Sequence, residues 1–300
     1  MYVVTGATGN TGKIVAQHLL AKNQPVRVIG RSAERLQPFV KQGAEAFVAE
    51  LTDPAALTRA FTGARAVYAM VPPNLSAPDF RACQQSVTDA LVVALQKSAV
   101  RHAVALSSVG ADKPDKTGPV AGLYALEQQF GRLAGVNVLF LRAGYFMENT
   151  LPQADVIKSI GVAAGPVRPD LKLPMIATRD IGAAAAEALL QLDFKDKQTR
   201  ELLGQRDLSY AEAAIIIGNA IGKPGLTYVQ APDEQLRPAF VQMGMSPDTA
   251  DQILELAVAL NSGHARALEP RSPRNTSPTS YETFVAEEFV PVYQGRSAAA

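Results

Sequence analysis

The sequence predicts an α/β protein with a doubly wound parallel sheet and a smaller, mostly helical C-terminal domain. Three features of the chain predict this class. Short apolar runs alternate with helical patterns from residue 2 to residue 142, as expected for strands that helices cover on both faces. A glycine-rich turn joins the first run to the first helix. After about residue 150 the apolar runs become sparse and helical patterns prevail.

The first strand and the turn after it carry the most specific signal. The apolar run 1–5 leads directly into Gly6, Gly9 and Gly12, and a helical pattern begins at once. In a strand–turn–helix unit that binds a dinucleotide, one glycine makes the turn, one lets the backbone approach the pyrophosphate and one lets the helix pack closely. A tight turn without a ligand is the alternative. The pattern predicts a Rossmann-type nucleotide site, completed by Thr8, Asn10 and Thr11.

Further strands and helices follow in alternation. Asp53 and Pro54 form an N-cap with proline at the first helical position, which predicts a helix over 55–61. A longer helix is predicted from about residue 79 to residue 97. This alternation predicts a parallel sheet with helices on both faces. The expected strands are 25–30, 45–50, 66–71, 103–107 and 136–142.

Capping signals predict the helices of the second half. Residues 268–278 are rich in Pro, Arg and Ser and are expected to form a loop. The last helix is expected to end near Phe289. The helices begin at Ile181 after Asp180, at Tyr210 in the capping box 209–212, at Pro247 after Ser246, and within the box 279–282.

The composition is that of an ordinary soluble globular protein, with 300 residues, 47% hydrophobic and 19% charged. The net charge is +1 and Lys and Arg are scattered, so neither nucleic acid nor a membrane is expected as a partner. No apolar run reaches the roughly 18 residues that span a bilayer, and no signal peptide is expected before the first strand. Cys83 is the only cysteine, which excludes an internal disulfide and predicts a cytoplasmic protein. The sequence leaves a homodimer open.

The end of the second strand decides between NAD and NADP. NAD-binding proteins of this kind carry an acid there for the ribose 2′-hydroxyl, whereas NADP-binding proteins carry an arginine for the 2′-phosphate. Here the strand ends in Gly30, Arg31 and Ser32, with Arg35 one helical turn further on. The guanidinium fork matches a phosphate, and the serine hydroxyl donates to it. We therefore expect NADP(H); the alternative is that the two arginines belong to a solvated loop and helix face.

The residues after the other strands are expected to line the cofactor site, because ligands bind beyond the carboxyl ends of strands in open α/β sheets. Leu51 is expected to border the adenine. The residues expected under the ribose and pyrophosphate are Met70, Val71 and Pro72, and those expected near the nicotinamide are Ser107, Ser108 and Gly144.

These expectations divide the chain into an NADP-binding Rossmann domain over 1–150 and a C-terminal substrate domain over 151–294. Parts of residues 175–205 are expected to return to the first domain. Residues 295–300 are expected to be a tail outside the fold.

The chain lacks the pair that short-chain dehydrogenases use, a tyrosine with a lysine four residues later. None of the eight tyrosines has this spacing. If Glu127 is the usual glutamate of that helix, the two positions hold Pro119 and Leu123, which are apolar. No metal site is expected, because the three histidines share no ligand spacing with a cysteine or a carboxylate.

Six blocks of sequence resemble the NmrA-like group of atypical short-chain dehydrogenases. The resemblance implies a Rossmann domain that binds NAD(P)(H), a small C-terminal domain and a cleft between them. Members of the group include redox sensors that bind the nucleotide without turnover, and NADPH-dependent reductases of quinones, azo dyes, imines or phenolics. The blocks cover nearly the whole chain in the order of the family: 6–12, 107–111, 141–149, 174–182, 204–210 and 276–284.

Within the group, the chain resembles the NAD(P)H:quinone reductases, which also lack the Tyr–Lys pair. The predicted function is hydride transfer from NADPH to a quinone or a similar small electrophilic acceptor. A non-catalytic NADP(H) sensor with a protein partner, or a specialised reductase of an imine or phenolic intermediate, are the alternatives. Tyr145 and Phe146 are expected beside the nicotinamide or packed between the domains, and Asn74 either binds an acceptor oxygen or lies in a turn. Tyr124 is the one hydroxyl considered as a proton donor.

Overall fold

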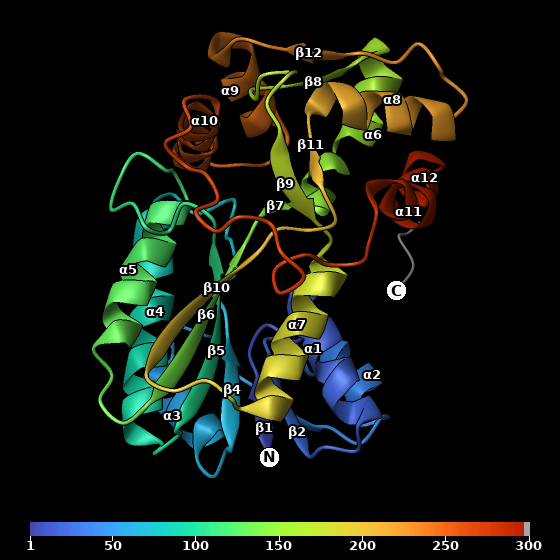
Figure 1. Cartoon of the computed structure of the whole chain (residues 1–300). Coiled ribbons are helices and arrows are strands. Elements are labelled where there is room, and N and C mark those ends of the chain that lie inside the picture. Colours follow the sequence, from blue (N-terminus) through green and yellow to red (C-terminus); the bar gives the residue numbers. More distant parts are fainter. Residues whose placement is uncertain (297–300) are drawn as a thin grey trace.

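The computed structural model describes residues 1–296, and a seven-stranded sheet forms its lower half (Figure 1). Every pairing in this sheet is parallel. Strand order reverses at β1, which confirms the doubly wound arrangement. From edge to edge the strands are β10 (Lys197–Leu202), β6 (Asn137–Ala143), β5 (His102–Ser108), β4 (Ala66–Ala69), β1 (Tyr2–Val4), β2 (Val26–Gly30) and β3 (Glu45–Val48).

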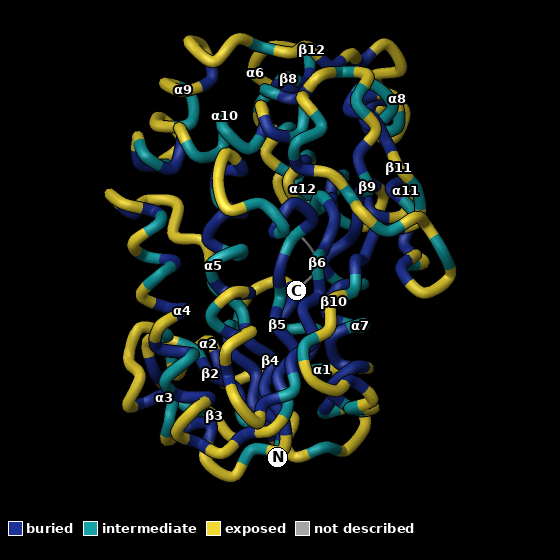
Figure 2. Tube along the Cα trace, turned by 60° about the vertical axis from the view of Figure 1, so that its left-hand side comes forward, coloured by how far each residue is buried: buried dark blue, intermediate teal, exposed yellow. Residues whose placement is uncertain are grey.

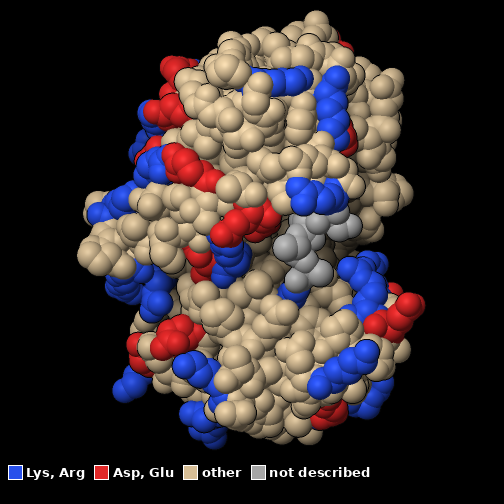
Figure 3. All heavy atoms as spheres, turned by 90° about the vertical axis from the view of Figure 1, so that its right-hand side faces the viewer, with Lys and Arg blue, Asp and Glu red and all other residues tan. Residues whose placement is uncertain are grey.

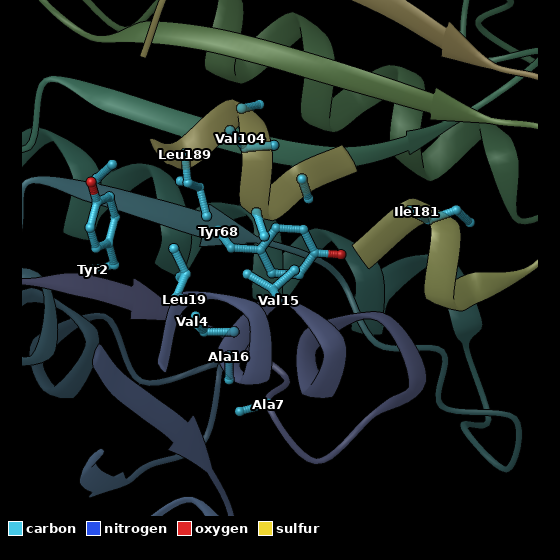
Figure 4. Packing of buried hydrophobic residues seen from close by; sticks show 14 of the residues in the cluster. Tyr2, Val4, Ala7, Val15, Ala16, Leu19, Tyr68, Val104, Ile181 and Leu189 are labelled. Atoms are coloured by element: carbon cyan, nitrogen blue, oxygen red, sulfur yellow. The ribbon is translucent and has the colours of Figure 1, made fainter. Parts of the chain in front are cut away.

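Helices cover both faces of the sheet (Figure 1). Their apolar sides bury two separate cores against it, one on each face. In Figure 4, Val15 and Leu19 of one helix lie against Tyr68 of β4 and Leu189 of a second helix. One layer comprises α1 (Asn10–Ala21), α2 (Ala33–Val40) and α7 (Thr178–Gln191), and the other comprises α3 (Pro54–Phe61), α4 (Phe80–Lys97) and α5 (Val120–Gly131).

The upper part of the molecule is built around a third apolar core. Figure 2 shows buried segments inside both parts and exposed turns around them. Besides the expected helices, this part contains helices over 153–160 and 233–242 and several short strands that the sequence did not predict. Strands of two to four residues carry too little periodicity to be recognised. Its elements are β7 (Tyr145–Phe146), η1 (Met147–Thr150), α6 (Gln153–Ile160), β8 (Ala163–Gly165), β9 (Leu173–Ile176), β11 (Asp207–Leu208), α8 (Tyr210–Ala220), β12 (Tyr228–Gln230), α9 (Asp233–Gln242), α10 (Pro247–Asn261), α11 (Tyr281–Phe284), η2 (Val285–Phe289) and α12 (Val290–Tyr293).

Residues 178–202 leave the upper part and join the sheet. Helix α7 packs along α1, as both Figure 1 and the contacts between them show. Strand β10 then pairs in parallel with β6 from Lys197↔Val138 to Leu202↔Ala143. The chain then returns to the upper part through Gly204, which has φ +73°.

Most capping predictions are confirmed. The Asp53 side chain accepts hydrogen bonds from the N–H groups of Ala55 and Ala56, both at 2.9 Å. Ser209 and its partner Glu212 form the predicted capping box of α8. Ser246 accepts from the N–H of residue 249 at 3.0 Å and caps α10.

Two capping predictions are wrong, and one contact explains both. Asp180 does not cap α7, which begins two residues earlier at Thr178. Its carboxylate accepts hydrogen bonds from Thr279, from the hydroxyl at 2.7 Å and from the N–H at 3.0 Å. Because this contact occupies Thr279, the next residue, Ser280, caps α11. The last helical segment also runs past Phe289 to Tyr293. Residues 297–300 of the expected tail lie outside the described residues.

Candidate functional site

The glycine turn between β1 and α1 has a conformation that requires glycine. Gly6 has φ +61°, and a Cβ atom there would lie 2.6 Å from the sulfur of Met70. The Gly9 N–H donates to the Gly6 carbonyl at 2.9 Å. A Cβ atom on Gly12 would overlap the same carbonyl group. Helix α1 therefore packs against the end of β1 only because Gly12 has no side chain.

The N-terminus of α1 is open and has no side-chain cap. Gly9 is the N-cap residue, and no side chain accepts a hydrogen bond from the first N–H groups of the helix. Gly9 and Asn10 are exposed, and Lys13 lies on the first turn. Free N–H groups and the helix dipole favour an anion at such a position. The turn therefore has the shape and the donors that a pyrophosphate requires.

The expected 2′-phosphate residues lie beside this turn. Arg35 extends from α2 back to the turn, where one Nη contacts the Thr8 carbonyl oxygen at 3.4 Å. Arg31 and Arg35 are exposed. The Ser32 hydroxyl accepts from the Arg35 N–H at 3.3 Å and caps α2, so its acceptor side is occupied and its proton is free to donate. Figure 3 shows a hollow between the upper and lower parts of the molecule, with basic side chains next to it.

Behind the turn, a buried polar chain ties it to β4. The Thr5 hydroxyl donates to the Tyr68 carbonyl at 3.0 Å and accepts from the Met70 N–H at 3.1 Å. The Tyr68 hydroxyl donates to the Thr11 hydroxyl at 2.8 Å, and burial raises the pKa of this phenol. The Thr11 side chain therefore faces the core. Only the backbone of Thr11 remains available to the ligand that the sequence predicts there.

At the end of β5, the two serines have different surroundings. The buried Ser107 hydroxyl donates to Glu127 at 2.6 Å, and the same carboxylate accepts two N–H groups of Arg142 at 2.9 and 2.6 Å. The bond to Glu127 is the main reason that the pKa of Arg142 is raised. Ser107 is therefore engaged inside the protein, whereas the half-buried Ser108 hydroxyl donates only to the carbonyl of the next residue.

The segment after β6 turns away from the sheet. A Cβ atom on Gly144 would overlap the Pro174 carbonyl oxygen of β9, so this glycine is required for packing. The half-buried Tyr145 points into the upper part, where its hydroxyl lies 2.8 Å from that of Tyr210. Phe146 packs against the core shared by α1 and α7. These contacts favour the packing interpretation of Tyr145 and Phe146.

The remaining predicted residues lie around the ends of β3, β4 and α5. Asn74 lies in an exposed turn, where its side chain accepts from the Ser76 hydroxyl at 3.1 Å and its carbonyl from the residue 77 N–H. These contacts favour the interpretation of Asn74 as a turn residue over its interpretation as a ligand of an acceptor oxygen. Pro72 is exposed, whereas Leu51, Val71 and Tyr124 are half-buried.

Several polar residues near these strand ends were missed at the sequence level. Arg142 pairs with Glu127, as described, and Glu201 of β10 accepts the N–H groups of Leu268 and Glu269 at 2.9 and 2.8 Å. Glu148 accepts two hydrogen bonds from Thr178. Arg142 and Glu148 belong to the block 141–149, one of the six that resemble the NmrA-like group. That resemblance was the only sequence signal for these two residues, and it does not indicate their hydrogen-bond partners.

Other features of the described residues do not compete with this site. A surface hollow of about 380 Å³ is lined by Lys113 and by residues within 262–266, and another of about 410 Å³ is lined by residues of α9 and α10; no residue of the glycine turn lines either hollow. Among residues 1–296, no group of three or more His, Cys, Asp or Glu side chains is arranged to hold a metal ion. None of the described helices is both long and apolar enough to cross a membrane.

The parallel sheet, its reversed strand order and the glycine turn define the Rossmann class of nucleotide-binding folds. Within that class the chain belongs to the NmrA-like family, whose model matches residues 2–290. It is similar to an NAD(P)H azoreductase from Xenophilus azovorans, with 30% identity over 256 residues, 85% of this chain and 86% of that protein.

A second relative is a (4-alkanoyl-5-oxo-2,5-dihydrofuran-3-yl)methyl phosphate reductase from Streptomyces griseus. It is 29% identical over 270 residues, which cover 90% of each chain. The crystal structure of an NADPH-dependent quinone oxidoreductase from Escherichia coli, complexed with NADPH, has the same fold. Its TM-score is 0.74 at 22% identity, and the match covers 100% of this chain and 96% of that chain.

Proposed function

We propose that this protein is an NADPH-dependent reductase that transfers a hydride to a quinone or a similar electrophilic small molecule. The observation that carries the proposal is the open N-terminus of α1 with Arg35 lying over the glycine turn. The helix start would bind the pyrophosphate of NADPH, and the arginines beside it would bind the 2′-phosphate. Both named relatives are reductases, and one is named for NAD(P)H, which supports the same chemistry.

The residues present fit this cofactor. The N–H groups at Gly9, Asn10 and Thr11 would hold the pyrophosphate, and Arg31 and Arg35 would hold the 2′-phosphate. When bound, the reduced nicotinamide supplies the hydride. The half-buried Ser108 lies at the strand end where the nicotinamide is expected. Ser107, which Glu127 and Arg142 hold, keeps that strand end in place.

The acceptor class follows from the side chains that this chain lacks. If Glu127 is the usual glutamate of that helix, Pro119 and Leu123 occupy the positions where a dehydrogenase would carry its tyrosine and lysine. A carbonyl whose oxyanion needs a proton at once is therefore a poor substrate. A quinone is reduced to a stabilised phenolate, which water or Tyr124 can protonate afterwards. The protein then needs only to hold the two reactants at near-attack distance in a dry site.

The names of related proteins support electrophilic acceptors as a class. One relative is named for azo compounds, another for an unsaturated furanone that carries a phosphate, and the structural neighbour for quinones. All three acceptor types have an electron-poor conjugated system that accepts a hydride without prior protonation. We therefore propose that the acceptor of this protein is a small molecule with an electron-poor conjugated system.

The test is a stopped-flow experiment with purified protein. NADPH is first titrated in the absence of an acceptor, and benzoquinone, naphthoquinone and an azo dye are then added while the nicotinamide absorbance is followed. We expect tight binding and oxidation that is faster than the uncatalysed rate. Tight binding without oxidation by any acceptor would contradict the reductase and favour the NADP(H) sensor. Failure to bind NADPH would contradict both.

A further inference from the structure

The surface hollow of about 380 Å³ lies where the loop after β5 meets the turn after α10. The loop contributes Lys113 to its lining, and the turn contributes Ser262, Gly263, His264 and Arg266. Three of these five side chains are basic. The hollow is therefore a place where basic groups from two distant segments of the chain come together at the surface.

Two contacts hold these segments against each other. The His264 ring Nε2 lies 3.3 Å from the Asp115 carbonyl oxygen. Gly110 approaches Ala265 so closely that a Cβ atom on the glycine would lie 3.0 Å from the Cβ atom of the alanine. Figure 1 shows the loop between β5 and α5 beside α10. A ligand in the hollow would therefore contact both the sheet domain and the upper part of the molecule.

The charge of the hollow differs from that of the whole chain, whose net charge is only +1. Among the described residues, none of those that line the hollow is acidic. Lys113 pairs with its neighbour Asp112 at 2.7 Å, but both side chains are partly exposed, and such a pair adds little stability and is readily exchanged. Arg266 is exposed and forms no ion pair within residues 1–296. Both cations can therefore bind an anion.

The end of α10 does not use these cations. Basic side chains are favourable near a helix C-terminus, because they interact with its free carbonyl groups. Here the backbone itself occupies those carbonyl groups, since three N–H groups within 262–265 donate to carbonyls within 258–260 at 3.0 Å each. The donors of Lys113 and Arg266 are thus left for a ligand.

We infer that this hollow binds a phosphate group, either as inorganic phosphate or as the phosphomonoester of a small organic molecule. A phosphate carries close to two negative charges at neutral pH and several strong acceptor oxygens, which match an ammonium group and a guanidinium fork. The volume of the hollow lies in the range of about 300–1,000 Å³ of small-molecule sites, so an organic group also fits. The inference goes beyond the proposed function, because it requires neither NADPH nor an acceptor.

The test follows the ring resonances of the three histidines by nuclear magnetic resonance in the full chain, without NADPH, at constant pH and ionic strength. His264→Asn identifies the resonance of His264. Titration with inorganic phosphate should shift this resonance in a saturable way, with a dissociation constant on the order of 1 mM. The resonances of His18 on α1 and His102 on β5 should not move. Phosphate bound at the glycine turn would leave His264 unaffected, so the two sites are distinguished.

Glycerol 3-phosphate is titrated in parallel and separates the two forms of the ligand. Tighter binding than that of inorganic phosphate would identify a phosphomonoester, and equal binding would identify the phosphate group alone; either result supports the inference. The absence of a saturable shift with both compounds would overturn it. The same shift produced by sodium chloride in place of phosphate would also overturn it, because the hollow would then not select a phosphate.

Three variants test the two cations. Lys113→Met and Arg266→Met should each weaken phosphate binding at least about tenfold, as for the loss of a hydrogen bond between charged groups. Lys116→Met is the matched control, since it removes the same charge from the same loop at a residue that does not line the hollow. Its phosphate affinity should stay within about twofold of the wild-type value, because solvent and salt screen exposed charges. Equal weakening by Lys113→Met and Lys116→Met would overturn the assignment of the hollow. Unchanged resonances of His18 and His102 verify that each variant is folded.

Discussion

Removal of the Glu127 side chain should strongly reduce the stability of the protein. Its side chain is 7% exposed and that of its partner Arg142 is 14% exposed. The carboxylate accepts two N–H groups from Arg142 and the hydroxyl of Ser107. Glu127→Ala therefore leaves a buried cation and a buried hydroxyl without partners.

The expected loss of unfolding free energy in Glu127→Ala can be estimated from these contacts. Breaking a buried ion pair from one side costs about 3–5 kcal/mol, and we take about 3 because Arg142 retains some exposure. The unpaired Ser107 hydroxyl adds about 1 kcal/mol. At roughly 2.1 cal/mol/K of unfolding entropy per residue, a chain of 300 residues should lose about 6 °C in Tm for these 4 kcal/mol.

The assay is urea unfolding followed by circular dichroism, with a thermal scan as a second measure. Arg237→Ala is the control, because Arg237 makes an equally bidentate pair with Asp251, at 2.6 and 2.9 Å, on the surface. Those side chains are 47% and 53% exposed, so the expected loss is about 0–1 kcal/mol. Replacing Glu127 and Arg142 together by methionine should restore much of the stability. A loss below about 1 kcal/mol in Glu127→Ala would refute the argument.

Three further predictions concern the nucleotide site and its surroundings. Arg31→Ala should weaken NADPH binding by about ten- to a hundredfold and NADH binding by less than about threefold, since only NADPH carries the 2′-phosphate. Gly9→Val should abolish dinucleotide binding and leave the far-ultraviolet spectrum unchanged, because its side chain would project at the open start of α1. Burial raises the pKa of Glu288 above its unfolded value of 4.5, so ionisation of Glu288 costs stability at neutral pH. Glu288→Gln should therefore increase the free energy of unfolding at about pH 7.5, and the increase should vanish below about pH 4.

Each of these predictions has a contradicting result. Equal weakening of NADPH and NADH would mean that Arg31 does not contact the 2′-phosphate. Unchanged cofactor affinity in Gly9→Val would place the nucleotide away from the glycine turn. If the gain in unfolding free energy of Glu288→Gln grew as the pH falls, it would contradict a raised pKa of the Glu288 carboxyl.

Six of the seven strands, their parallel arrangement and the glycine turn could be predicted from the sequence, whereas the edge strand β10 could not. These features depend on local patterns: apolar runs that must be buried on both faces, and glycines at positions where a Cβ atom would overlap the backbone. The caps at Asp53, Ser209 and Ser246 were also predictable, because each acts on N–H groups two or three residues away.

Which polar side chains are free to act on a ligand depends on tertiary contacts that the sequence does not reveal. Ser107 and Thr11 are near the predicted positions, but Glu127 and Tyr68 engage their hydroxyls from residues 20 and 57 positions away. The cap that the sequence assigned to Asp180 failed for the same reason, since its partner Thr279 is 99 residues distant. A local pattern records what a residue can do with its sequence neighbours. Hydrogen-bonding capacity is limited, however, and in this fold the partners that use it come from strands and helices far away in the chain.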